Sequence, residues 1–189
     1  MRTQHLSLAV VLVAISLLSI PAPGAAFFTQ RVAGTVLLVI TLTNNRSYML
    51  QDAVCRNRLW LPLLLSLLVL LLAPYLPPPR GGNLSLTSMG RAAWLFTSFL
   101  YFSCYELLMR GLVLNRFRAL HPMPVAILLN ILLYALMHLP KDRLETLACL
   151  PFGLLLCLLT LYCRSPVAAA ILHTCLGLQM EGQLPFLHP

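Results

Sequence analysis

Four ionisable side chains lie inside otherwise apolar stretches of the sequence: Glu106, Arg110, His138 and His173. An ionisable group inside a membrane helix costs a few kcal/mol on insertion, so it needs a partner or a function. Glu106 and Arg110 are four residues apart, share a helix face and can pair. Taken singly, this pair is explained as a structural ion pair, and each histidine as an interhelical hydrogen bond. Together, one carboxylate and two imidazoles on three helices predict a shared polar cavity suited to water activation, proton relay or metal binding.

The metal alternative has little support in the sequence. One glutamate and two histidines could form a three-ligand zinc site, which is a common catalytic arrangement. The sequence contains no HExxH motif, however. On the residues alone, a metal site is therefore the less favoured alternative.

The composition identifies the elements that must position these residues. The chain has 189 residues, of which 59% are apolar and 10% are charged. A typical soluble domain is about 45–50% apolar and about 25% charged, so this composition excludes a soluble globular protein. The formal charge is +8, and the basic residues lie mostly between apolar runs instead of forming the basic face of a nucleic-acid-binding protein. We expect membrane lipid as a partner and no nucleic acid.

Apolar segments of helical length recur along the whole chain. A bilayer-spanning helix needs about 20 mostly apolar residues, and somewhat fewer suffice in a tightly packed bundle. The seven candidates are Leu6–Ile20, Val32–Thr43, Trp60–Leu76, Ala92–Val113, Val125–Leu139, Leu144–Cys163 and Val167–Leu178. Period-two alternation is absent, so we predict an all-α, polytopic transmembrane bundle of about seven helices. Within it, residues 1–90 form leading helices and loops, residues 91–180 the core that carries the polar residues, and residues 181–189 a short tail.

The first apolar segment has an alternative interpretation. Arg2, a 15-residue apolar run and then Gly24-Ala25-Ala26 are similar to a signal peptide with a small-residue cleavage site. Because every later segment is also apolar, we expect residues 1–26 to stay attached as a membrane helix. The distribution of Arg and Lys across a seven-helix bundle favours a cytoplasmic N-terminus.

Three motifs follow one another along the second half of the chain. They are Glu106-x-x-x-Arg110-Gly111, then Tyr134-x-x-x-His138, then His173 preceded by Ser165-Pro166. Their order resembles the CAAX-protease and bacteriocin-processing (CPBP) family, whose pattern is EExxxR, FxxxH and HxxxN on successive core helices. The resemblance covers residues 92–177. It implies a glutamic-type intramembrane endopeptidase that needs no cofactor, acts on a membrane-anchored peptide or protein, and lies with several membrane passes in a bacterial inner membrane.

The resemblance also implies roles for individual residues. Glu106 would activate water as the general base, and His138 would either orient that water or share its proton. His173 would donate to the oxyanion, helped by the hydroxyl of Thr174. If Glu106 is the base, Arg110 should turn away from it, because a neighbouring cation makes a carboxylate a weaker base.

Two positions depart from the family pattern. The first glutamate of the first motif, usually the base, is replaced by Tyr105, and the asparagine of the third motif is replaced by Gly177. A water molecule in the space at Gly177 could replace the lost amide, and Tyr134 in place of phenylalanine is a milder change. We therefore expect a peptidase. The alternative is a catalytically degenerate member of the same scaffold that acts as a partner or immunity factor.

The helix lengths leave open whether Glu106 and His138 meet. Each lies about 14–15 residues, or ~21–22 Å of helix rise, along its own helix, and antiparallel helices would place them at opposite faces. They meet only if the first helix is displaced or continues as helix beyond Gly111. If they are far apart, Glu145 is the better partner for His138. Glu145 is otherwise an ordinary first-turn residue of the next helix.

Overall fold

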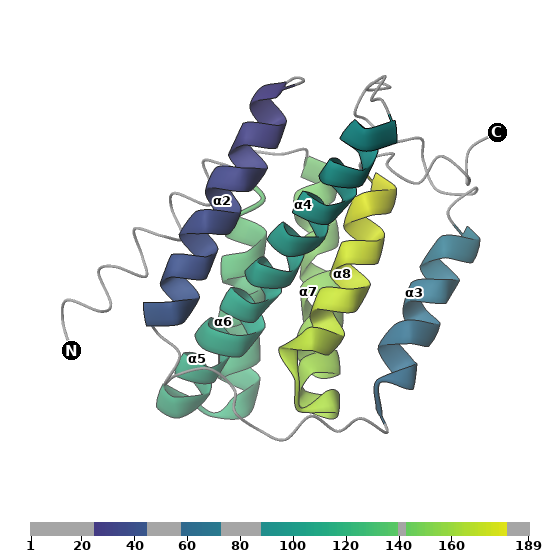
Figure 1. Ribbon diagram of the computed structural model, residues 1–189. Helices are drawn as coiled ribbons and strands as arrows, with labels where there is room; N and C mark the ends of the chain where they lie inside the picture. The colour runs from purple at the N-terminus through teal and green to yellow at the C-terminus, as the bar shows by residue number, and fades with distance from the viewer. Residues whose placement is uncertain (1–24, 45–57, 73–87, 140–142, 181–189) are drawn as a thin grey trace.

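The described part of the chain is helical, with no strand. The computed structural model describes residues 25–44, 58–72, 88–139 and 143–180. Its elements are α2 (Ala25–Asn44), α3 (Trp60–Leu72), α4 (Ser88–Glu106), η4 (Leu107–Val113), α5 (Leu114–Leu120), α6 (Met123–Leu136), α7 (Arg143–Cys163) and α8 (Pro166–Met180). The elements α4, η4 and α5 follow one another without a break, so the described residues form six helical rods (Figure 1). The predicted all-α bundle is confirmed, and the predicted segment Leu6–Ile20 lies outside the described residues.

Three helix boundaries differ from the sequence-based expectation. Helix α2 begins at Ala25 and takes in Gln30 and Arg31, where we expected a start at Val32. The rod that carries Glu106 runs past Val113 to Leu120. Helix α6 ends at Leu136, so His138 lies in the tight turn that follows and not inside the helix as predicted. The proline at position 140 explains this early end, because the residue before a proline disfavours the helical conformation.

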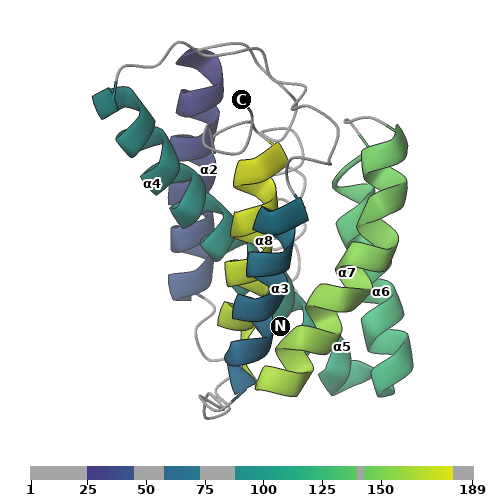
Figure 2. The same cartoon turned by 90° about the vertical axis from the view of Figure 1, so that its right-hand side faces the viewer.

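Helix α8 occupies the middle of the packing arrangement. It contacts α3, α4 and α7, while α2 packs on α4 and α6 packs on α7 (Figures 1 and 2). One buried cluster joins α2, α4, η4 and α6 around Leu38, Leu108 and Leu112. A second joins α7 and α8 around Leu156 and Leu172. The described core is therefore built on both sides of the helix that carries His173.

The outer surface of the bundle is apolar. On α3, the buried residues are Pro62 and Ser66, and the outward residues are leucines that are about half exposed: Leu63, Leu64, Leu67, Leu68, Leu71 and Leu72. A helix at the surface of a protein in water has its polar side chains outside, so the arrangement on α3 is the reverse. In water, such an exposed apolar patch would favour aggregation. Two described helical stretches, Ala92–Leu120 and Arg143–Cys163, are long and apolar enough to cross a bilayer. The outward leucines therefore suit contact with lipid.

A well-formed turn joins α7 to α8 and sets the direction of the helix that carries His173. Arg164 has a left-handed φ of 53°, the N–H of Ser165 donates to the carbonyl of Thr160 at 3.0 Å, and that of Arg164 to Leu161 at 3.4 Å. This is the Schellman pattern that ends many helices. The hydroxyl of Ser165 accepts a hydrogen bond from the N–H of Val167 at 3.2 Å. Ser165 thereby caps the N-terminus of α8, whose first residue is Pro166.

Candidate active site

The site begins at an irregular turn directly after Glu106. Leu107–Val113 forms a π-helix, in which the N–H of Leu114 donates to the carbonyl of Met109. The side-chain amide of Asn130, on α6, donates to the same carbonyl at 2.8 Å. Single π-turns within α-helices are rare and are frequent at functional sites. At this π-helix, the side chain of Asn130 on α6 thus forms a hydrogen bond with the backbone next to Arg110.

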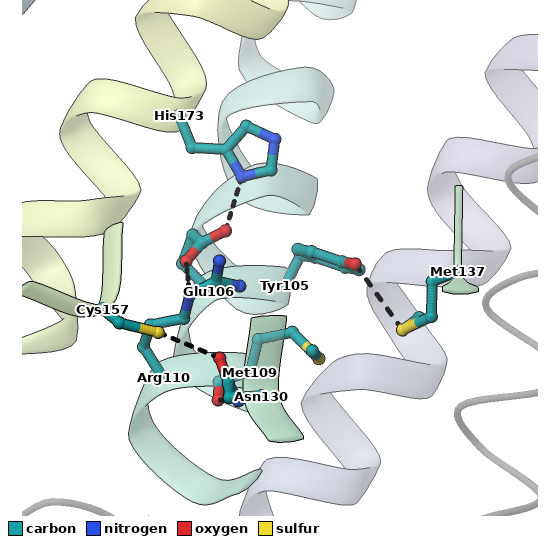
Figure 3. Close-up of polar contacts among 8 residues, drawn as sticks. All are labelled: Tyr105, Glu106, Met109, Arg110, Asn130, Met137, Cys157 and His173. Carbon is teal, nitrogen blue, oxygen red and sulfur yellow. Dashed lines mark hydrogen bonds and ion pairs between the residues drawn. The ribbon is translucent and has the colours of Figure 1, made fainter. Parts of the chain in front are cut away.

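Glu106 is the centre of a buried charged cluster (Figure 3). Its Oε1 lies 2.5 Å from Nδ1 of His173, on α8, and its Oε2 lies 3.3 Å from Nε of Arg110. An ionised carboxylate only accepts hydrogen bonds, so Nδ1 of His173 is the donor. Glu106 and Arg110 are fully buried, whereas His173 keeps 10% of its side chain exposed. The imidazole is therefore the accessible member of the cluster.

Arg110 does not turn away from Glu106, as we expected for a glutamate base. Its guanidinium carbon also lies 4.5 Å from the ring centre of Tyr134. Gly153 of α7 leaves room for this stack, since a Cβ there would lie 3.1 Å from the Tyr134 ring and 3.7 Å from Nη2 of Arg110. Nη1 and Nη2 have no hydrogen-bond partner among the described residues. Turning Arg110 away from Glu106 would leave a buried cation unpaired, which is strongly destabilising.

Aromatic rings surround the imidazole of His173. The ring centres of Phe102, Phe152, Tyr105 and Tyr134 lie 4.9, 5.6, 5.8 and 6.0 Å from its own. These rings come from α4, α6 and α7. Such apolar surroundings strengthen the hydrogen bond to Glu106, because little water screens it. One carboxylate and four rings thus hold the imidazole in a single orientation.

The structure joins Glu106 to His173 and not to His138. Nδ1 of His138 donates to the backbone carbonyl of Tyr134 at 2.9 Å, and the two ring centres are 4.6 Å apart. Because Tyr134 also faces His173, its ring connects the two histidines. The helical rod does continue past Gly111 to Leu120, which was one of the conditions for Glu106 and His138 to approach each other.

Tyr105 occupies the position where the family pattern has its first glutamate. Its side chain is buried, and its hydroxyl lies 3.6 Å from the sulfur of Met137, to which it donates (Figure 3). Its ring stacks on Tyr101 with centres 6.3 Å apart. A phenol bonded in this way connects α4 with the end of α6 and does not act as a base.

The expectation of a water at Gly177 is wrong. The ring of Phe102 fills this space, and a Cβ at Gly177 would overlap it. An asparagine could therefore not enter without moving Phe102. The hydroxyl of Thr174, next to His173 in sequence, is buried and has no hydrogen-bond partner among the described residues.

The first turn of α7 lies beside His138. The hydroxyl of Thr146 donates to the backbone carbonyl of His138 at 2.9 Å. Glu145 is in the same turn and is partly buried. This placement agrees with both interpretations of Glu145, as a first-turn residue of α7 and as a neighbour of His138.

Sequence analysis missed Asn130 and Cys157. Asn130 is fully buried, and its Oδ1 accepts the thiol of Cys157, on α7, at 3.3 Å. A sequence signal for Asn130 does exist, because it is the one amide in the apolar helix Met123–Leu136 and lies one turn before Tyr134. Cys157 carries no such signal, since a cysteine in an apolar helix is ordinary.

A metal centre was the alternative chemistry for these residues. Among the described residues, no three His, Cys, Asp or Glu side chains gather in a way that could hold a metal ion. The cluster of Glu106, Arg110 and His173 instead combines a carboxylate, a cation and an imidazole, which is an arrangement for moving a proton.

The segment that contains this cluster matches a known protein family. Residues 87–178 match the family described as type II CAAX prenyl endopeptidase Rce1-like. Over this segment, which is slightly less than half of the chain, the protein is similar to the Rce1-like family. The resemblance to CAAX-type proteases is thereby confirmed. The Rce1-like segment contains Glu106, His138 and His173, and the family is one of membrane-embedded proteases. No curated protein and no solved structure matches the chain significantly.

Proposed function

We propose that the chain is an intramembrane peptidase that hydrolyses a peptide bond of a membrane-anchored substrate. The observation that carries this proposal is the 2.5 Å contact between the buried carboxylate of Glu106 and Nδ1 of His173, inside the Rce1-like segment. A carboxylate that orients an imidazole fixes its tautomer and stabilises the imidazolium that forms when it takes a proton. The outward leucines support a multi-pass position in a membrane, which we assign to a bacterial inner membrane.

In the reaction that we propose, Glu106 activates water through His173. Because Nδ1 donates to Glu106, Nε2 takes the proton of the water as its oxygen attacks the substrate carbonyl. The C–N bond of the tetrahedral intermediate then breaks, and the imidazolium returns the proton to the leaving amine. His173 is thus the proton carrier in this proposal, and not the oxyanion donor implied by the resemblance. The buried hydroxyl of Thr174 is our candidate donor to the oxyanion.

His138 and Arg110 have supporting roles in this mechanism. A carbonyl only accepts, so Nδ1 of His138 donates to Tyr134, and this bond fixes the orientation of the imidazole ring. In this mechanism His138 orients the attacking water. Arg110 holds the second oxygen of Glu106 at 3.3 Å and keeps the carboxylate ionised in apolar surroundings.

A second function is favoured by two specific observations. Both oxygens of Glu106 are engaged, and Tyr105 stands where the family pattern has its first glutamate. These features suit a catalytically degenerate member of the scaffold that binds a membrane partner, for example as an immunity factor. In that case Glu106, Arg110 and His173 only connect α4 to α8.

A cleavage assay in proteoliposomes separates the two functions. Prenylated and unprenylated membrane-anchored peptides would be incubated with the wild type, Glu106→Gln and Glu145→Gln, and products would be identified by mass spectrometry. We expect turnover by the wild type, a loss of about 10³–10⁴ in Glu106→Gln because the tautomer of His173 is no longer fixed, and near-normal turnover in Glu145→Gln.

The other outcomes are equally informative. Turnover that survives in Glu106→Gln and disappears in Glu145→Gln would move the catalytic carboxylate to the start of α7. A folded wild type without turnover on either class of peptide would favour the degenerate member.

A further inference from the structure

A cavity lies where α5 meets the start of α6, away from the site around Glu106. Its volume is about 320 Å³, and it is open to the outside of the bundle. Its lining consists of Asn115, Arg118, Ala119 and Met123. Small-molecule sites have volumes of about 300–1,000 Å³, so the cavity is large enough for a small charged group. Arg118 follows Glu106 by roughly 18 Å of helix rise, so this cavity is separate from the candidate active site.

Helix α5 fixes the cation of this cavity. Its first residue, Leu114, is fully buried and packs against residues of α6 and α7. Asn115, Arg118 and Ala119 are spaced three and four residues apart and therefore share one face of α5. Arg118 is partly exposed and forms no hydrogen bond, ion pair or ring contact with another residue that the structure describes. Its guanidinium is thus available to a ligand in the cavity.

The end of the bundle that holds the cavity is positively charged. The arginines just before α3, on α5 and in the turn between α7 and α8 lie at this end: Arg58, Arg116, Arg118 and Arg164 (Figures 1 and 2). The described part of the chain has two acidic residues, and neither offsets this charge. Glu106 is buried and paired with Arg110, and Glu145 lies in the first turn of α7, at the opposite end. An excess of arginine is typical of the cytoplasmic side of a membrane protein.

The chemistry of the lining suits a lipid headgroup. A guanidinium presents its N–H groups in one plane, and two of them can bond two oxygens of a phosphate. Basic pockets between membrane helices on the cytoplasmic side bind anionic headgroups in this way. The lining also includes the apolar side chains of Ala119 and Met123, and the neighbouring Leu120 is 69% exposed. A cation bordered by apolar residues matches a phosphate that is attached to a lipid better than a free phosphate.

We propose that this cavity binds the phosphate of one anionic phospholipid and that Arg118 is the residue that contacts it. The inference does not depend on the proposed peptidase function, because no residue of the cavity belongs to the cluster around Glu106. It differs from a general attraction of the basic end to a negative membrane surface, since it requires one lipid at one place.

Native mass spectrometry of the full chain, released from detergent micelles, tests this proposal. The protein would be titrated with phosphatidylglycerol, which is anionic, and with phosphatidylcholine, which carries a phosphate without net charge. We expect one phosphatidylglycerol to bind the wild type about tenfold more tightly, the equivalent of one charge-assisted hydrogen bond. Arg118→Gln should remove this preference. Ala119→Trp should also weaken binding about tenfold, because its ring fills the cavity without changing the charge.

Arg164→Gln is the matched control for charge. It removes one exposed arginine from the same end of the bundle and does not alter the lining of the cavity. We expect it to weaken the binding of phosphatidylglycerol by less than about threefold. Equal losses in Arg118→Gln and Arg164→Gln would reveal a diffuse attraction and overturn the site. Equal binding of the two lipids by the wild type would overturn it as well.

Thermal unfolding in micelles checks folding and the source of the phosphate. Without added lipid, the wild type, Arg118→Gln and Arg164→Gln should have similar Tm values. Phosphatidylglycerol should raise the Tm of the wild type and of Arg164→Gln, because it binds only the folded state, and leave that of Arg118→Gln unchanged. Inorganic phosphate at millimolar concentration should neither raise the Tm nor displace the lipid. If it did both, the cavity would be a site for free phosphate, and the assignment to a lipid would be wrong.

Discussion

Two regions of the site each hold one histidine, and the two histidines are bound differently. Between α4 and α8, Nδ1 of His173 bonds the carboxylate of Glu106 at 2.5 Å. In the turn after α6, Nδ1 of His138 donates to the backbone carbonyl of Tyr134, four residues earlier in the chain, at 2.9 Å. Both bonds fix a tautomer, but only the carboxylate supplies a charge that stabilises an imidazolium. In the mechanism that we propose, this difference gives proton transfer to His173 and a positioning role to His138.

The regions also differ in what fixes their backbone. His173 lies within helix α8, whose start is set by the turn at Arg164 and Ser165. His138 lies in a turn after α6 and is anchored by the hydroxyl of Thr146 at 2.9 Å. A side chain on a helix is positioned more rigidly than one in a turn. This difference again favours His173 as the group that must meet the substrate with precise geometry.

The largest predicted effect distinguishes the two histidines directly. His173→Ala should lower kcat by at least as much as Glu106→Gln, about 10³–10⁴, because the proton carrier itself is lost. His138→Ala should lower kcat only about five- to tenfold, the equivalent of one hydrogen bond to the water. Steady-state kinetics in proteoliposomes, with the folded fraction determined for each variant, would measure both.

The relative size of the two losses decides the assignment. Equal losses would mean that the histidines act as one unit, and a larger loss in His138→Ala would reverse the roles.

The sequence predicted the helices well because their signal is composition. Long runs of leucine cannot face water, so six of the expected segments correspond to described helices. Their ends were less predictable. Gln30 and Arg31 were expected to lie outside a helix, but a cation that stacks on Tyr101 and Phe102 is accommodated inside α2. Tertiary contacts that no local pattern contains thus decided this boundary.

The members of the site were predictable, but their partners were not. Spacing along a helix correctly paired Glu106 with Arg110. The choice between His138 and His173 as partner of Glu106 depended on the contact of α4 with α8, which is a long-range property. The π-helix at Leu107–Val113 was also missed, because its cause is partly remote: Asn130 donates to the carbonyl of Met109 from another helix.

A smaller effect is predicted where the family pattern is broken. Gly177→Asn should destabilise the protein by about 1–3 kcal/mol, the usual cost of overpacking a core, because its side chain would overlap Phe102. Thermal unfolding in detergent micelles, followed by tryptophan fluorescence, would show a lower Tm.

The double variant tests whether Phe102 is the cause. Combining Gly177→Asn with Phe102→Ala removes the overlap, so its cost should be well below the sum of the two single costs. Additive costs would show that Gly177 is required for another reason.

The smallest predicted effect concerns the hydrogen bond that supports the π-helix. Asn130→Leu removes the donor to Met109 but leaves the bond from the N–H of Leu114 to the same carbonyl. We expect a loss of about 0.5–1.5 kcal/mol in stability, the usual net value of one hydrogen bond. Cys157→Ser is the matched variant, because it keeps a donor to Oδ1 of Asn130 and should change Tm very little. If Cys157→Ser were as destabilising as Asn130→Leu, the contact between α6 and α7, and not the bond to the π-helix, would be the reason for the buried amide.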